Sequence, residues 1–178
     1  MSHFTDHPTP IPPTSLSPLI YIGGKAALNI FSEKGTGDWH MLATFFVKNP
    51  TGVRALSFIS GEGCPTDTVW IFGDEGIYDC TEKLAYQRIP HEGERAYAAS
   101  HARATADLVI GWILRGGTAN FVCLDDWMPR DSDKQEVYDL IDKAMPHLND
   151  EQQTKAREWL RRNPVDYDWG KPDPEIKI

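Results

Sequence analysis

The chain has 178 residues, of which 40% are hydrophobic and 25% are charged. This composition is typical of a folded globular protein and argues against extensive disorder. Acidic residues outnumber basic ones by 26 to 18, giving a formal net charge of −8, which disfavours direct binding to nucleic acid because the surface repels a phosphate backbone, and suits a cationic protein partner.

The cysteines and the hydrophobic runs indicate the compartment. Cys64, Cys80 and Cys123 are odd in number and too widely spaced for a zinc knuckle, which argues against a secreted disulfide scaffold and indicates reduced, buried thiols. No run approaches the roughly 20 apolar residues that cross a bilayer, and no signal-peptide pattern is present. We therefore expect a cytoplasmic protein without a membrane partner.

Composition divides the chain into an arm, one domain and a tail. Residues 1–18 contain five of the thirteen prolines and no sustained apolar period, which predicts a flexible proline-rich arm. Residues 165–178 form a polar tail. For residues 19–164 the pattern predicts a single α+β domain, in which an antiparallel meander sheet of about four strands packs against one long helix and two C-terminal helices.

The first half of this domain begins with a short apolar run at residues 19–22. Gly23 and Gly24 stop the run, and residues 26–31 suit a short helix. Four strand-like runs follow, over residues 41–47, 53–59, 68–72 and 77–80. We expect antiparallel pairing, because parallel strands need longer connections than the turns that separate these runs.

The second half is mainly helical. Residues 94–115 carry apolar side chains at helical spacing and predict the longest helix. Residues 121–124 suit either a last strand or a buried loop. Two shorter helices follow, and their starts are marked by capping residues: Ser132 with Gln135, and Asn149 or Asp150.

Gly23 and Gly24, followed by the sequence Asp38-Trp39-His40 before a predicted strand, resemble the minimal nucleotidyltransferase signature. In that family a glycine pair opens a short helix that approaches a triphosphate, and acids on the next strand hold magnesium, which prefers oxygen ligands. The resemblance implies nucleotide binding by Gly23, Gly24 and Asp38, with Mg²⁺ and a nucleoside triphosphate as cofactors. The chain departs from the signature at His40, which replaces the second acid and is a poor ligand for a hard cation.

The same stretch has a structural interpretation, in which the glycines form a turn and Asp38 caps a backbone amide. Asp38, His40 and His101 are candidates for acid-base chemistry, with Asp79 as a partner, and His91 could join the two histidines at a metal. A lone histidine on an apolar helix is more often a hydrogen-bonded structural residue. We therefore assign no catalytic residue and expect no metal site.

Tryptophans beside carboxylates point to protein recognition, because a rigid apolar anchor with a charged rim is typical of interfaces. The candidate partner-binding residues are Asp125, Asp126, Trp127, Asp166, Asp168 and Trp169. In the alternative interpretation these rings only seal the edge of the core. The leading hypothesis is an acidic, non-enzymatic module of antitoxin, immunity or inhibitor type, of bacterial or phage origin. Such a module would bind a cationic protein, such as a toxin or nuclease, and would need no cofactor. The alternative is the nucleotidyltransferase-like enzyme.

Overall fold

The structure is a computed structural model that describes residues 17–38, 59–89, 91 and 93–165. The predicted strand at residues 41–47 and most of the one at residues 53–59 lie outside these residues. So do nearly all of the predicted arm and tail.

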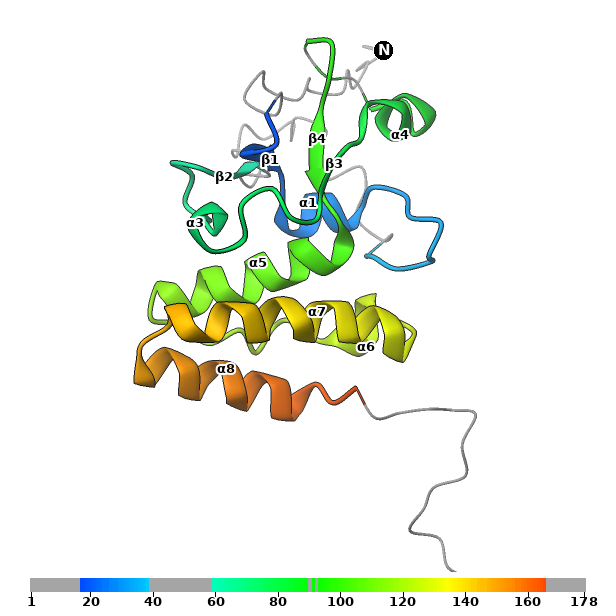
Figure 1. The fold of residues 1–178 in the computed structure, drawn as a ribbon. Coiled ribbons are helices and arrows are strands. Elements are labelled where there is room, and N and C mark those ends of the chain that lie inside the picture. The colour runs from blue at the N-terminus through cyan, green and yellow to red at the C-terminus, as the bar shows by residue number, and fades with distance from the viewer. Residues whose placement is uncertain (1–16, 39–58, 90, 92, 166–178) are drawn as a thin grey trace, which may run out of the picture.

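A four-stranded sheet forms one layer of the molecule (Figure 1). Its strands run in the order β2-β1-β4-β3 and comprise β1 (Ile20–Ile22), β2 (Ile59–Gly61), β3 (Ile77–Asp79) and β4 (Tyr97–Ala99). The outer pairs are antiparallel, but β1 and β4 pair in parallel with Ile22 opposite Ala98. The α+β class is thus confirmed, whereas the purely antiparallel meander is wrong. The connection from β1 to β4 is long enough for the crossover that parallel pairing needs.

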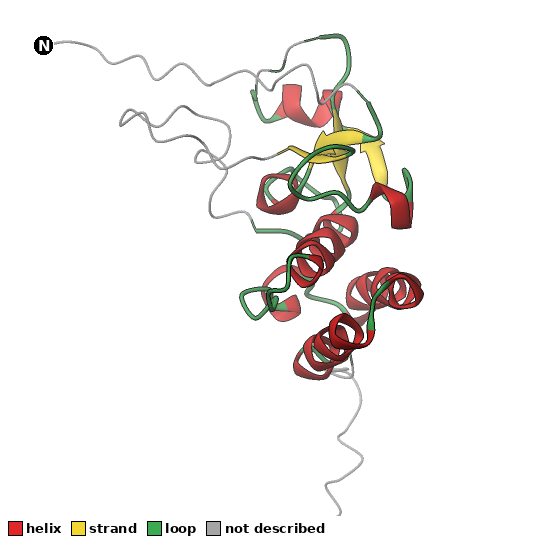
Figure 2. Cartoon of the chain, turned by 90° about the vertical axis from the view of Figure 1, so that its left-hand side faces the viewer, coloured by secondary structure: helices red, strands yellow, loops and turns green. Residues whose placement is uncertain are grey.

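Helix α5 (His101–Leu114) is the central element of the fold. It lies between the layer of α1 (Gly24–Leu28) and β4 and the layer of α7 (Asp131–Ala144) and α8 (Asp150–Arg162), as Figures 1 and 2 show. Because neighbours cover it on both sides, 11 of its 14 residues are buried. The helix is therefore a buried core element rather than an amphipathic surface helix.

The predicted strand at residues 68–72 is instead a helical turn, α3 (Val69–Phe72). A carboxylate oxygen of Asp67 accepts the backbone N–H of Val69 at 3.1 Å, and the Thr68 carbonyl accepts the N–H of Phe72 at 3.0 Å. The Thr68 hydroxyl is also fixed, because it donates to buried Asp107 at 2.5 Å. These local and tertiary bonds turn the chain and outweigh the strand preference of the apolar residues.

The predicted helix at residues 94–115 is divided into strand β4 and helix α5. Ser100 separates them as the N-cap of α5, and its hydroxyl oxygen accepts the N–H of Arg103 at 3.2 Å. The alanine-rich segment before Ser100 pairs on both sides, with β1 and β3. The sheet therefore decides the conformation of a segment whose own propensity favours a helix.

The segment around residues 121–124 contains no strand. Val122 and Leu124 are buried, and Leu124 begins the short helix α6 (Leu124–Trp127). Helix α7 begins at Asp131 without a side-chain cap, so the capping box predicted for Ser132 and Gln135 does not form. The Gln135 amide instead donates to Asp139 at 2.8 Å.

The last helix begins as predicted. Asn149 is the N-cap of α8, and its side chain accepts the N–H of Gln152 at 2.9 Å while the Gln152 side chain accepts the N–H of Asn149 at 3.0 Å. This reciprocal pair is a complete capping box. The remaining elements are helix α4 (Thr81–Tyr86) and the 3₁₀ turn η3 (Met145–His147).

One hydrophobic cluster joins the layers, with buried side chains such as Tyr21, Ile110, Ile141 and Trp159. Cys80 is buried as expected, whereas Cys64 and Cys123 are only half-buried, and all three thiols are free. Within the described ranges, no helix is both long and apolar enough to span a bilayer.

Candidate functional site

The predicted nucleotide-binding residues lie at the two ends of α1. Gly23 is the N-cap of this helix, whereas the backbone N–H of Asp38 donates at 2.8 Å to the carbonyl of Leu28, the last residue of the helix. Asp38 is therefore not placed beside the glycines. His40 lies outside the described residues, so nucleotide binding stays a prediction.

Both glycines have a structural reason to be glycine. A Cβ atom on Gly23 would lie 2.2 Å from the hydroxyl oxygen of Ser60 on β2, which is closer than any stable contact. Gly24 has a φ of +54°, a left-handed conformation that side chains disfavour. The glycine pair therefore serves the turn and the close approach of β2, as the structural interpretation predicts.

His101 is held as a neutral, hydrogen-bonded residue at the start of α5. Its Nε2 lies 2.8 Å from the carbonyl of Ile30, and its Nδ1 lies 2.7 Å from the hydroxyl of Thr36. The carbonyl can only accept, so Nε2 carries the proton and Nδ1 accepts from Thr36. Burial lowers the pKa of His101 below its ordinary value. Both ring nitrogens are thus occupied in tying the segment after α1 to α5.

No metal site forms among the residues that the structure describes, because no three of their His, Cys, Asp and Glu side chains converge. Asp79, the proposed acid-base partner, accepts hydrogen bonds from the hydroxyl and backbone N–H of Thr81 at 2.6 and 3.0 Å. These bonds lower the pKa of Asp79. Its carboxylate therefore caps the start of α4.

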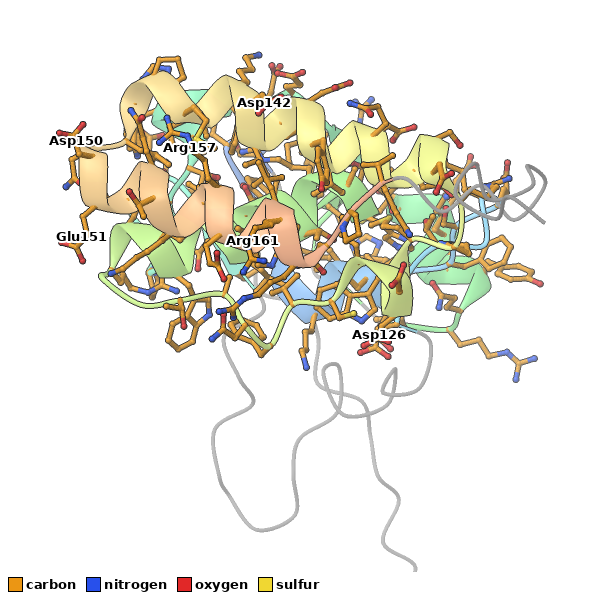
Figure 3. The ribbon with its side chains drawn as sticks, turned by 90° about the horizontal axis from the view of Figure 1, so that it is seen from below. Asp126, Asp142, Asp150, Glu151, Arg157 and Arg161 are labelled. Atoms are coloured by element: carbon orange, nitrogen blue, oxygen red, sulfur yellow. The ribbon has the colours of Figure 1, made fainter. Side chains whose placement is uncertain are left out.

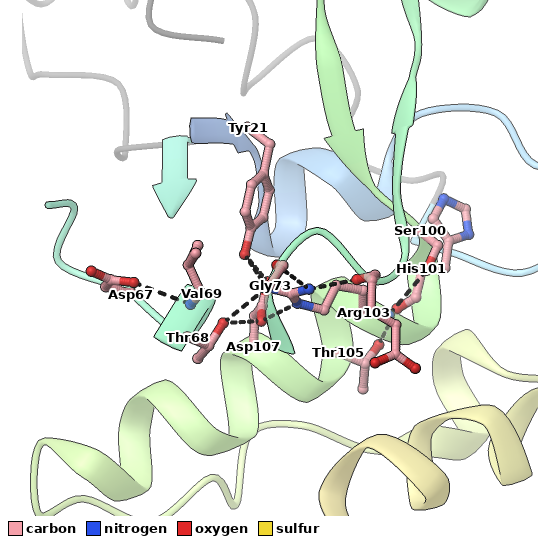
Figure 4. A network of polar contacts seen from close by, with 11 residues as sticks. Tyr21, Asp67, Thr68, Val69, Gly73, Ser100, His101, Arg103, Thr105 and Asp107 are labelled. Carbon is pink, nitrogen blue, oxygen red and sulfur yellow. Dashed lines mark hydrogen bonds and ion pairs between the residues drawn. The ribbon is translucent and has the colours of Figure 1, made fainter. Parts of the chain in front are cut away.

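The most buried polar group of the described chain is a network that the sequence analysis missed (Figure 4). Arg103 and Asp107 lie one turn apart on α5, their side chains are fully buried, and the guanidinium Nε donates to Asp107 at 2.8 Å. Tyr21 donates to the other carboxylate oxygen at 2.7 Å, and Thr68 completes the set at 2.5 Å. The only signal in the sequence is the pair of opposite charges at i and i+4 within an otherwise apolar helix.

The Arg103 guanidinium also holds the turn before β3, because it donates to the carbonyls of Gly73 at 3.2 Å and Glu75 at 2.5 Å. Burial raises the pKa of Asp107, while the adjacent Arg103 opposes that rise. Burial and the Asp107 carboxylate likewise raise the pKa of Tyr21. The network therefore joins β1, α3, the β3 turn and α5 as a structural device, and both oxygens of Asp107 accept hydrogen bonds within it.

A pocket of about 420 Å³, here called the α1–α5 pocket, is bordered by Asp107 of this network. Its walls come from four separated parts of the chain: the start of α1, strand β2 with the loop after it, α5 from Asp107 onward, and the segment before α6. Residues that line it include Gly23, Gly24, Lys25, Ser60, Thr66, Leu108, Trp112, Arg115 and Phe121. A second pocket, of about 280 Å³, lies beside His101 and is lined by more charged side chains.

The negative charge of the chain is concentrated in residues 124–151. This segment holds nine acidic and three basic residues, so it accounts for six of the eight excess negative charges. Asp126, Asp142 and Asp150 point outward from α6, α7 and α8, at different edges of the helical layer (Figure 3). Among the described residues these three and Asp139 form no ion pair. We call the outward side of residues 124–151 the acidic face.

The predicted partner-binding residues are only partly displayed. Trp127 is 6% exposed and belongs to the core, so it presents no anchor to a partner. Asp126 is exposed without an ion pair among the described residues, whereas Asp125, also exposed, pairs with Lys134 at 2.5 Å. Asp166, Asp168 and Trp169 lie outside the described residues.

Comparison with known proteins found no match to a family model, a curated protein or a solved structure.

Proposed function

We propose that this chain is an acidic protein-binding module, of antitoxin, immunity or inhibitor type, that neutralises a cationic protein in the bacterial or phage-infected cytoplasm. The acidic face would be the docking surface. The described catalytic candidates fit structural roles, since His101 and Asp79 are used in hydrogen bonds that hold the fold.

The concentration of charge in residues 124–151 carries this proposal. Carboxylates without an internal counter-ion keep their full field and steer a partner of opposite charge. Asp139 and Asp142 are three residues apart on α7, so they lie on one side of the helix. A basic helix or loop laid along α7 would meet several carboxylates at once.

The proposal is tested by purifying the chain from its native host and reconstituting the captured complex from purified components. We expect a stoichiometric complex with a basic protein whose affinity falls as salt rises. The triple change D126N, D139N and D142N should weaken binding about tenfold or more, since each contact at an interface rim contributes a fraction of a kcal/mol to ~1 kcal/mol.

A matched control removes the same charge elsewhere. Glu62, Glu82 and Glu94 are exposed and lie outside the acidic face, so E62Q, E82Q and E94Q together should leave most of the affinity. Equal weakening by the two triple variants would show that net charge alone acts. A free monomer that captures no stoichiometric partner from its host would refute the module.

A nucleotidyltransferase-like activity is the second proposal, and one observation favours it: Gly23 and Gly24 border the α1–α5 pocket. It requires Mg²⁺ and a nucleoside triphosphate, with Asp38 as the acid. Calorimetry with Mg²⁺ and each nucleoside triphosphate tests it. A heat of binding that is present in the native chain and absent in D38A supports the enzyme. If no triphosphate binds, this second proposal is refuted.

A further inference from the structure

The α1–α5 pocket has the shape and charge of a small-ligand site. At about 420 Å³ it falls within the range of natural ligand pockets, which are usually apolar with a few placed polar groups. It lies against α5, whose first half is fixed by the buried Arg103–Asp107 pair. Asp107 of this pair also borders the pocket, so part of the lining is held by the buried network.

Two aromatic rings form its apolar wall. Trp112 on α5 and Phe121 before α6 meet edge to face, with ring centroids 5.4 Å apart. Although the rings touch each other, they remain 43% and 45% exposed. An exposed aromatic pair beside a pocket offers a surface on which a planar ring can pack.

The cations of the pocket have no acidic partner in the described chain. Lys25 and Arg115 both line it, and neither forms an ion pair with a carboxylate of the described residues. The carboxylate in the floor, Asp107, is already neutralised by Arg103. In a chain of net charge −8, this pocket therefore has a locally positive edge.

Arg115 is also held in place. Its Nη1 donates to the carbonyl of Pro65 at 2.8 Å, and its guanidinium lies over the Trp112 ring, 5.3 Å from the centroid. The guanidinium thus sits at the junction of the apolar wall and the loop after β2. Ser60 of β2 lines the same pocket.

We propose that the α1–α5 pocket binds a small planar aromatic anion, with its ring against Trp112 and Phe121 and its negative group toward Arg115 and Lys25. A ring without charge would leave the cations unused, and an anion without a ring would leave the aromatic wall in water. This inference does not rest on the acidic face, which involves other residues.

The test uses two probes of the same shape, 2-naphthoate and 2-naphthamide, which differ in one negative charge. NMR titration follows the indole N–H signals, that of Trp112 being the one lost in W112L. We expect 2-naphthoate to shift the Trp112 signal and leave that of Trp70, exposed on α3, in place. The acid should bind about tenfold more tightly than the amide, which corresponds to one charge-assisted contact.

Matched variants separate the pocket from general charge. R115Q removes the charge but keeps a donor for Pro65, and it should abolish the preference for the acid. R157Q removes an exposed arginine on α8 that bonds only to Gln153 among the described residues, and it should change neither affinity. Circular dichroism checks that each variant folds. If R115Q does not fold, K25Q takes its place, and we expect it to lose part of the preference for the acid over the amide.

The proposal is overturned if the Trp112 signal does not move at about 5 mM 2-naphthoate, because the dissociation constant would then be too weak for a specific site. It is also overturned if acid and amide bind equally, or if R115Q and R157Q act alike. Unchanged 2-naphthoate binding by the D126N, D139N and D142N variant would show that this pocket and the acidic face are separate.

Discussion

Arg103 and Asp107 form an ion pair at 2.8 Å with both side chains fully buried, one helical turn apart on the central helix. An isolated buried charge is very costly, and the pair is tolerated because Tyr21 and Thr68 supply the remaining hydrogen bonds of the carboxylate. Its removal should therefore reveal how strongly the fold depends on one polar centre.

Loss of either partner should destabilise the protein severely. D107L and R103M each leave an uncompensated buried charge, and we expect the free energy of unfolding to fall by about 3–5 kcal/mol in each. The double variant should fall by much less than the sum, because no charge is left unpaired. Urea unfolding measures all three. Additive effects would show that the two side chains act independently.

Substitutions of the two glycines at the start of α1 should destabilise the protein for different reasons. G23A places a methyl group against Ser60, and we expect a loss of about 1–3 kcal/mol from overpacking. G24A places its methyl group at an ordinary 3.5 Å from the Leu108 side chain but must hold a positive φ, with a loss of about 1–2 kcal/mol. S60G should restore much of the stability of G23A and none of that of G24A. Urea unfolding measures the stability of each variant. If S60G rescues both glycine variants, or neither, these two causes are wrong.

His101 should make the protein less stable in mild acid. Burial lowers its pKa in the folded state, so in the window just below the ordinary histidine pKa of about 6.5 the unfolded chain binds more protons than the folded one. The free energy of unfolding should be greatest above that value and fall as the pH drops through it. In H101Q this slope should disappear, whatever the absolute stability. A slope that persists in H101Q would assign it to another group.

The two predicted helix caps give a matched pair of substitutions. N149A removes the observed capping box of α8 and should cost about 1 kcal/mol. S132A changes a residue of the same capping class whose side chain makes no cap in α7, so we expect a change within about 0.5 kcal/mol. Thermal or urea unfolding compares them directly. An S132A loss as large as that of N149A would mean that the cap forms in solution.

Helical spacing and capping residues predicted those parts of the fold that short-range interactions determine. The buried positions of α7, Val137, Leu140, Ile141 and Ala144, follow from helical spacing, and the start of α8 follows from its capping residue. The segment at residues 97–99 could not be assigned in this way. Alanine fits a helix better than a strand, and only pairing with β1 and β3, remote in sequence, decides its conformation.

The candidate site was less predictable because its parts come together only in three dimensions. Gly23 and Gly24 stood out in the sequence, but the residues opposite them, Trp112 and Arg115, had no pattern linking them to the glycines. Asp38, close in sequence, lies at the far end of α1. At this pocket, residues far from the glycines in sequence thus lie beside them in space, whereas a residue nearer in sequence does not.

The parallel pair of Ile22 and Ala98 also bears on how the chain is made. Synthesis proceeds from the N-terminus, so β1 leaves the ribosome long before its partner β4 exists. Among the described strands only β2 can join it early, and the other edge of β1 stays open for about 76 residues of synthesis (98 − 22), or several seconds. An open strand edge is a template for unwanted pairing. A nascent chain stalled before Ala98 should therefore bind chaperones or aggregate, whereas one released after α5 can close the sheet.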